Sequence, residues 1–576
     1  MLLTACASQN SKQEDDLSTP SDSDTGLDAD DDADDDTNDD ADDDADDDND
    51  CRGDRTYADA ISCSRILGSL TIGADADPSL SGLETLEYIR DDLLITAEAP
   101  VVELSGLNGL SRIDGMLSIQ GTQQLTTLTG IDNLEHVETG IHISENTVLE
   151  SLEGLNSLRS CEGWSDDYED FYPNFDATSV IADNPALVNL YGLSGLLRCY
   201  QLAVSDNESL TALFASPEGM RIEGMQLFRN PSLTSLDSLR DVIWQNEGWG
   251  EWANDLTIAD NEALTDISGL GDIDGIRLGL SGPHVDANLQ SIAGFDIRSI
   301  KITDSMISDI DALLETGTRT VHLNNVTGLA RLDGFTGLAG LSLENIPGLT
   351  SLSGLNAYDL DYLTLINLPD LTTLTGLPRL SDGSGRHSTS LKIKDNPQLV
   401  NLIGLEATTE LYDLNVAGNP ALTSLAGLEN IESVYELSVV GNPALTSLAG
   451  LENIETILKG IDISDNSALE SIAHLEGLTD VSVNVLTIID NAVLENLDGL
   501  EGLQSVTFEL TISDNPTLVD ISGLHSLEEA TTAGYGTGLS VLRNEQLCES
   551  LISEMIAIIG PDNVDIGEIA DNDDGC

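Results

Sequence analysis

The aromatic residues best suited to contact a ligand lie in two short segments, "CEGWSDDYEDFYPNF" at 161–175 and "DVIWQNEGWGEW" at 241–252. These segments hold all four tryptophans of a chain in which only 4% of the residues are aromatic. Aromatic rings beside carboxylates suit the binding of sugars or peptide side chains. The candidate ligand-binding residues are Trp164, Tyr168, Tyr172, Trp244, Trp249 and Trp252. A second interpretation stays open, in which these rings pack as a small core over the flank of the fold.

No catalytic spacing accompanies the rings. The chain contains no HExxH, GxSxG, Walker A or GxGxxG motif. Acidic pairs are so frequent that two neighbouring carboxylates do not identify a glycosidase. No CxxC spacing supports a zinc site. The sequence therefore predicts a protein that is not an enzyme and has no cofactor or resident metal.

The charge of the chain excludes one class of partner. Its 576 residues include 103 acidic residues against 22 Lys and Arg, and the formal net charge is −81. A nucleic-acid binder needs a cationic stripe that releases counterions, and the sequence shows none. Direct adsorption to anionic lipid is disfavoured for the same reason. No segment is apolar enough to predict a membrane-spanning helix.

Residues 1–50 differ in composition from the rest of the chain. They hold 21 acidic residues and one Lys, in runs such as "DADDDADDDTNDDADDDADDD". Like charges repel and almost nothing can be buried, so residues 7–50 are predicted to be a disordered, extended tether. Such a run can associate weakly with Ca²⁺, but it lacks the glycine and the regular oxygen spacing of an EF-hand loop.

An internal repeat organises residues 51–576. The stretch "GNPALTSLAGLENIE" occurs at 418–432 and again at 441–455. Apolar residues alternate before the Asn and recur every third position after it, which fits a coil whose short sides each send one side chain inward. Stacked units bury this stripe in a continuous core, whereas one unit alone cannot. We assign the same corner position to Asn146, Asn184, Asn207, Asn230, Asn261, Asn345, Asn367, Asn396, Asn419, Asn442, Asn466, Asn491, Asn515 and Asn544.

The repeat resembles a known family. "RIEGMQLFRNPSLTSLDSL" at 221–239 and "SVTFELTISDNPTLVDISGL" at 505–524 are similar to the pattern of receptor L-domains and related bacterial leucine-rich repeats. The resemblance covers roughly residues 51–560. It implies a mainly β fold, a parallel β-solenoid, which binds an extracellular glycan or protein and does not catalyse. We expect about twenty rungs at about 4.8 Å each, one rung being one turn of the solenoid.

The ends of this repeat region should be capped, because an open solenoid end exposes core and strand edges. We expect an N-terminal cap at 51–70 and a C-terminal cap at 545–576 that contains a short helix. Both aromatic segments interrupt the repeat at the same phase, just before the next strand. They should therefore emerge from the same edge of the solenoid.

The start "LLTAC", residues 2–6, resembles a bacterial lipobox, in which Cys6 would carry the lipid anchor. Residues 1–6 would then be a truncated lipoprotein signal. Only five residues precede Cys6, so either the start is placed too late or the resemblance is chance. The resemblance implies a lipid-anchored protein of the bacterial cell surface or outer membrane; the alternative is a secreted protein.

Six further cysteines suit an exported chain with disulfides, and six allow fifteen pairings. Their clustering suggests one pairing at the start of the fold, one around an insertion and one at the end. The expected disulfides are Cys51–Cys63, Cys161–Cys199 and Cys548–Cys576.

Together these features favour a surface-tethered, non-enzymatic recognition or adhesion protein that binds a glycan or a protein. The membrane would be reached through the lipid anchor only. The alternative is a structural envelope or matrix protein without a specific ligand. A third interpretation, a carbohydrate-active enzyme, fits less well.

Overall fold

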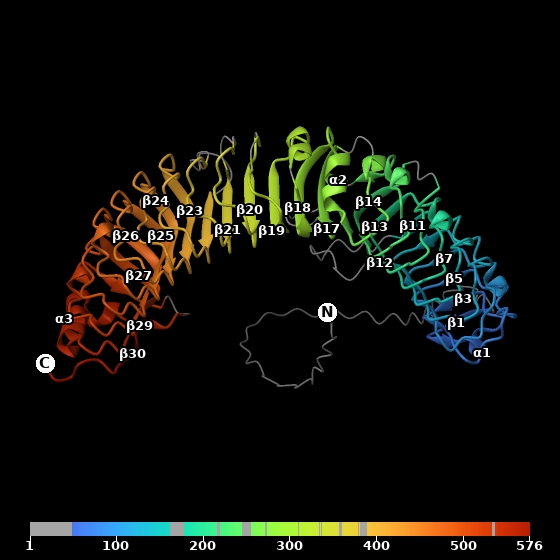
Figure 1. Ribbon diagram of the computed structural model, residues 1–576. Helices are drawn as coiled ribbons and strands as arrows, with labels where there is room; N and C mark the ends of the chain where they lie inside the picture. The colour runs from blue at the N-terminus through green and yellow to red at the C-terminus, as the bar shows by residue number, and fades with distance from the viewer. Residues whose placement is uncertain are drawn as a thin grey trace, which may run out of the picture. The chain divides into compact units, whose positions relative to one another are not determined.

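The computed structural model describes residues 49–161, 178–215, 219–244, 255–270, 274–308, 310–332, 334–335, 337–355, 360–377, 380, 389–532 and 536–576. Residues 49–576 form a mainly β solenoid of about 19 turns, as the repeat predicts. Its strands join one sheet of parallel pairs, such as β13 with β14 and β20 with β21. Figure 1 shows the strands side by side in chain order from β1 to β30.

In the first rungs each turn carries two short strands. They are β1 Asp50–Arg52, β2 Arg55–Thr56, β3 Arg65–Leu67, β4 Leu70–Ile72, β5 Tyr88–Ile89, β6 Leu93–Ile95, β7 Arg112–Ile113, β8 Met116–Gln120, β9 His136–Val137, β10 Gly140–Ser144, β11 Ser160–Cys161 and β12 Thr178–Ala182.

The strands from β13 onward include longer ones, in which the two strands of a turn merge, and a few short ones. They are β13 Arg198–Ser205, β14 Arg221–Phe228, β15 Ile243–Trp244, β16 Leu256–Ala259, β17 Asp274–Ser281, β18 Asp296–Met306, β19 Thr320–Thr327, β20 Gly340–Glu344, β21 Tyr362–Ile366, β22 Ser390–Lys394, β23 Glu410–Ala417, β24 Ser433–Val440, β25 Thr456–Ser464, β26 Val481–Ile489, β27 Leu503–Ser513, β28 Glu529–Ala530, β29 Gly538–Leu542 and β30 Ile566–Ala570.

Helices are short. The α-helices are α1 Tyr57–Ala60, α2 Val285–Ser291 and α3 Glu549–Ile559, and the 3₁₀ helices are Ser105–Leu107, Tyr191–Leu193, Asp237–Leu239, Ser268–Leu270, Asp311–Glu315, Ala473–Leu475, Ser522–Leu524 and Pro561–Asn563. Helix α3 lies between β29 and β30 and buries Ile552, Met555 and Ile559, so the short helix expected in the C-terminal region is present. Within the described part of the chain, no helix has the length and apolar character needed to cross a bilayer.

The core is the stripe of apolar residues with period three. In one turn its members Leu422, Leu425, Leu428, Ile431 and Val434 are at most 1% exposed. Each side chain faces the interior, and the equivalent residues of the neighbouring turns join it in one continuous cluster. Because one turn has no second layer of its own, the stripe is buried only by stacking.

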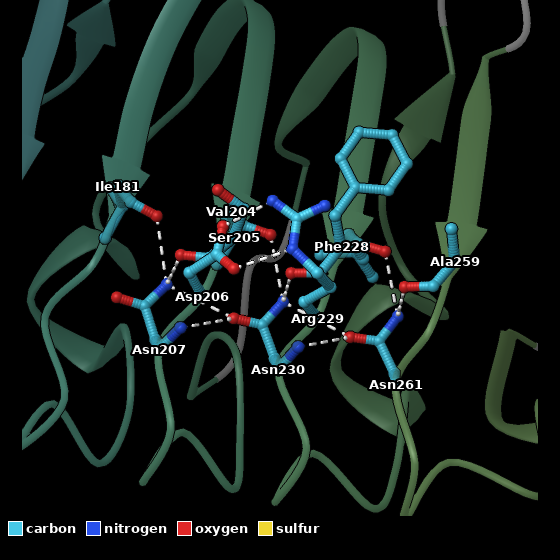
Figure 2. A network of polar contacts seen from close by, with 11 residues as sticks. Ile181, Val204, Ser205, Asp206, Asn207, Phe228, Arg229, Asn230, Ala259 and Asn261 are labelled. Atoms are coloured by element: carbon cyan, nitrogen blue, oxygen red, sulfur yellow. Dashed lines mark hydrogen bonds and ion pairs between the residues drawn. The ribbon is translucent and has the colours of Figure 1, made fainter. Parts of the chain in front are cut away.

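A ladder of buried asparagines holds the corners together. The side chain of Asn230 donates to the main-chain oxygens of Val204 and Phe228 at 2.9 and 3.0 Å. Its main-chain N–H donates to Asn261 Oδ1 at 3.0 Å, so each Asn also accepts from the previous rung. Figure 2 shows Asn207, Asn230 and Asn261 linked in this way. The ladder satisfies corner groups that would otherwise be buried without partners.

The assignment of Asn345 and Asn367 to this ladder was wrong. Both adopt the left-handed backbone at φ 55° and 48°, one residue before the corner, where Asn tolerates that conformation. The buried corner position is taken by Ile346 and Leu368, each 0% exposed. Leu368 still donates its N–H to Asn396 Oδ1 at 3.0 Å. The ladder also continues one step beyond the predicted set, since Asn544 donates to Asn572.

Two of the three expected disulfides are present, Cys51–Cys63 and Cys548–Cys576. Cys161 and Cys199 occupy paired positions on β11 and β13 and are both buried, but no disulfide joins them. Their sulfurs are directed to different main-chain oxygens: the Cys161 thiol lies 4.0 Å from Arg198 O, and the Cys199 thiol lies 3.8 Å from Gln201 O. The expected third disulfide was therefore wrong in this structure.

Candidate binding face

Only one of the six predicted ligand-binding residues lies among the described residues. Trp244 ends β15, is partly buried and packs against the core. Its Nε1 is closed off from solvent and has no hydrogen-bond partner among the residues that the structure describes. This placement supports the packing interpretation for Trp244. The other five candidates, and the anchor residue Cys6, lie outside the described residues: Trp164, Tyr168, Tyr172, Trp249 and Trp252.

The flanks of the two aromatic segments confirm that both leave the solenoid at the same edge. One segment lies between β11 and β12, and the other lies between β15 and β16. In both cases the chain leaves after the first short strand of a turn and returns at the second. In the longer strands this place is a bend between two buried apolar residues, for example between Leu411 and Leu414 in β23.

The strands also present a face that points away from the core. We call it the outer face, and it consists of the residues of each strand that are in register with three positions of β21. In β21 these are Tyr362, Thr364 and Ile366, which alternate with buried Leu363 and Leu365. Since the strands pair in register, the outer-face residues of successive rungs stand in columns.

All lysines of the described residues lie on the outer face or at its edge, on strands β18 to β25. They are Lys301, Lys392, Lys394 and Lys459. Both stacked ring pairs found among the described residues lie on the same strands. In a chain with 103 acidic residues and 22 basic ones, this gathering marks one stretch of the solenoid.

The first ring pair joins β21 to β19 across β20. Tyr362 Oη lies 2.8 Å from His322 Nε2, and the two rings stack with centroids 5.7 Å apart. Tyr362 pairs with Gly340 in the register, and its ring reaches His322 across β20 because Gly340 has no side chain to block it. Burial and the nearby Lys301 ammonium lower the pKa of His322, so the neutral imidazole is favoured.

The glycine gives a testable prediction. A Cβ on Gly340 would lie 2.1 Å from Tyr362 Cε1, so Gly340→Ala must displace the ring. We expect a loss of about 1–3 kcal/mol in the free energy of unfolding, as for other overpacked sites. Gly224→Ala is the matched control in β14, because its Cβ would meet nothing closer than 3.6 Å. It should change stability by no more than about 0.5 kcal/mol. Denaturant titration of both variants checks this, and equal stabilities would contradict it.

The second ring pair lies at the edge where the aromatic segments leave the solenoid. Tyr412 and Tyr435 occupy the bends of β23 and β24 and stack with centroids 4.3 Å apart and an angle of 10° between the rings. Tyr412 is 40% exposed, so the stack presents a ring surface to solvent. Beside it, Lys459 Nζ lies 2.5 Å from Glu436 Oε2.

Carboxylates and an amide lie next to this stack. Burial and the facing Glu436 raise the pKa of Asp413. Asp413 Oδ1 and Asn415 Oδ1 are both closed off from solvent without a hydrogen-bond donor among the described residues. Buried acceptors without donors are rare in folded proteins. The face therefore offers a ring platform, ammonium donors and unused acceptors within a few rungs.

The sequence interpretation missed the two tyrosines, although a signal was present. Tyr412 and Tyr435 are 23 residues apart, which is the length of the repeat, and each precedes an acidic residue and a leucine, in "LYDLNV" and "VYELSV". A search by repeat phase would have aligned them.

A groove of about 530 Å³ lies elsewhere on the same turns. Four glutamates contribute to its lining: Glu406, Glu432, Glu452 and Glu455. Its lining amides, Asn430 and Asn453, already donate to main-chain oxygens at 2.7 and 2.6 Å. The groove therefore offers mainly acceptors, whereas the outer face offers both donors and acceptors.

Comparison with known proteins does not identify a family for the chain. No protein-family model matches the chain, and no curated protein matches it. A crystal structure of PEPR1–AtPEP1 matches with 13% sequence identity and a TM-score of 0.22, over 82% of this chain and 85% of that one.

Proposed function

We propose that this solenoid is a non-enzymatic recognition module that binds an extracellular glycan or protein through the outer face of strands β17 to β25. One observation carries the proposal: the lysines and stacked rings of the described residues are confined to this stretch. Exposed ion pairs contribute little to stability, so stability alone does not account for the gathering of the lysines.

We further propose that the protein works at a bacterial cell surface, tethered through Cys6, and that residues 7–50 act as the spacer. The support is the lipobox-like "LLTAC" followed by the acidic run. A structural role without a ligand is the alternative, and the binding screen described next separates the two.

The test is a screen of the full chain on arrays of immobilised glycans and peptides, repeated with a blocking variant. Thr364→Trp places a large ring at the centre of the proposed face, on β21. Thr511→Trp is the matched control in the same column, on β27. We expect Thr364→Trp to weaken binding at least about 30-fold, or about 2 kcal/mol, and Thr511→Trp to leave it unchanged.

Thermal melting confirms that each variant is folded. If Thr364→Trp is not, Ser438→Trp on β24 takes its place. Equal binding by a folded blocking variant and the control would overturn the proposed face. The absence of any ligand for the wild-type chain would favour the structural alternative.

A further inference from the structure

The outer face of strands β17 to β22 differs in charge from the rest of the molecule. Its basic residues are Arg277, Lys301, Lys392 and Lys394, together with His322, and its only carboxylate is Glu344. We call these positions the basic window. The next three strands carry a carboxylate each on this face, Asp413, Glu436 and Asp462.

Two cations of the window are not neutralised by the described residues. Arg277 is already used, since its Nη2 lies 2.8 Å from buried Asp255. Lys394 Nζ lies 3.9 Å from exposed Asp395. No carboxylate among the described residues forms an ion pair with Lys301 or Lys392. In a chain with a formal net charge of −81, unpaired lysines require an explanation.

The window is also hydrophilic. Between the lysines the face carries small or polar residues, such as Ser342 and Thr364, and Ile366 is the only aliphatic residue. Lys301 and Lys392 are four strands apart, roughly 19 Å at about 4.8 Å per strand. A protein partner needs buried aromatic and apolar anchors in the centre of its interface, and the window offers few.

From these features we infer that the basic window binds an anionic polysaccharide laid along the rungs, with carboxylate or sulfate groups on the lysines and hydroxyls on the serine and threonine side chains. This inference rests on the proposed function and names its ligand class. The remaining negative charge of the protein repels a polyanion, but at physiological ionic strength charges beyond about 8 Å are largely screened. The ligand therefore feels mainly the window that it touches.

The experiment measures binding of the full chain to three soluble polymers at physiological salt: polygalacturonate, dextran sulfate and neutral dextran. The triple variant K301Q/K392Q/K394Q removes the three charges without shortening the side chains greatly. Arg543→Gln is the control for removal of a surface cation, since Arg543 follows β29, outside the proposed face, and is paired with Asp514.

We expect at least one anionic polymer to bind and neutral dextran not to bind. The triple variant should bind the anionic polymer roughly tenfold more weakly, and Arg543→Gln should bind it as the wild-type chain does. The preference between the two anionic polymers tells carboxylate from sulfate. Equal binding of dextran, or unchanged binding by the triple variant, would overturn the inference.

Polyglutamate is a further probe. Tighter binding of polyglutamate than of both anionic polysaccharides would replace the polysaccharide by an acidic polypeptide. The wild-type chain could bind none of these polymers but bind a ligand on the array, and the Thr364→Trp variant could lose that binding. This result would contradict the inference and leave the proposed function intact. If the wild-type chain binds neither the polymers nor any ligand on the array, the proposed function is contradicted as well.

Discussion

Replacing Asp255 with alanine should lower the free energy of unfolding by about 3–5 kcal/mol, because it removes the buried carboxylate that binds the largely buried guanidinium of Arg277. Asp255 is 1% exposed, and its carboxylate accepts from the main-chain N–H, Nε and Nη2 of Arg277 at 2.8, 3.1 and 2.8 Å. The guanidinium of an arginine keeps its charge in proteins, so the cost is not avoided by loss of a proton.

Replacing Arg277 instead of Asp255 should cost less stability, and the loss should depend on pH. Burial raises the pKa of Asp255, and Arg277 opposes that rise. In Arg277→Met the opposing charge is gone, so the folded state keeps the proton at pH values where the unfolded state, with a pKa of about 3.9, has lost it. Stability then falls as pH rises through this window. The variant should be more stable at pH 5 than at pH 7.

Denaturant titration at both pH values checks these expectations. Glu436→Gln is the control, because it breaks an ion pair between half-exposed groups and should cost no more than about 1 kcal/mol. An Asp255→Ala variant as stable as Glu436→Gln would show that the pair contributes little at this place.

Replacing Asn442 with alanine should lower the free energy of unfolding by about 3 kcal/mol, since several buried groups lose their partners at once. Asn442 is 0% exposed. Its side chain donates to Val416 O and Val440 O at 2.9 and 3.1 Å, and its Oδ1 accepts the main-chain N–H of Asn419 at 3.1 Å. Alanine makes none of these bonds.

Asn345→Gly is the matched control for the ladder. Asn345 lies outside the buried ladder and is partly exposed, and the glycine that replaces it tolerates the left-handed backbone at this position. We expect a change of about 0.5 kcal/mol or less. Equal destabilisation by both variants, in denaturant titration, would refute the special role of the buried ladder.

The periodic part of the fold could be predicted from sequence because each turn repeats the same physical demand. The inward stripe at Leu422, Leu425 and Leu428 needs a partner turn, and only a stack supplies one. The register at Asn345 could not be predicted in the same way. An Asn before Ile-Pro looks like the corner Asn before Pro, and only the backbone shows that Ile346 is the buried residue.

The proposed binding face was harder to predict because its residues are far apart in sequence. Lys301 and Lys392 lie 91 positions apart, and they belong to one face only through the register of five stacked strands. Sequence interpretation favoured the edge from which the aromatic segments leave as a binding edge, and Tyr412 and Tyr435 lie at that edge. It gave no sign that the few lysines of the chain gather beside it.

Because the chain has few lysines, contact between a ligand and the proposed face can be measured directly. The chain has five lysines, and Lys12 and Lys459 lie outside the basic window. The full chain is acetylated at its lysines with and without the tightest-binding ligand of the screen. Mass spectrometry then gives the rate of labelling of each lysine separately. The account predicts that the ligand slows labelling of Lys301, Lys392 and Lys394 and leaves Lys12 unchanged. Unchanged labelling of all three window lysines at saturating ligand would contradict it.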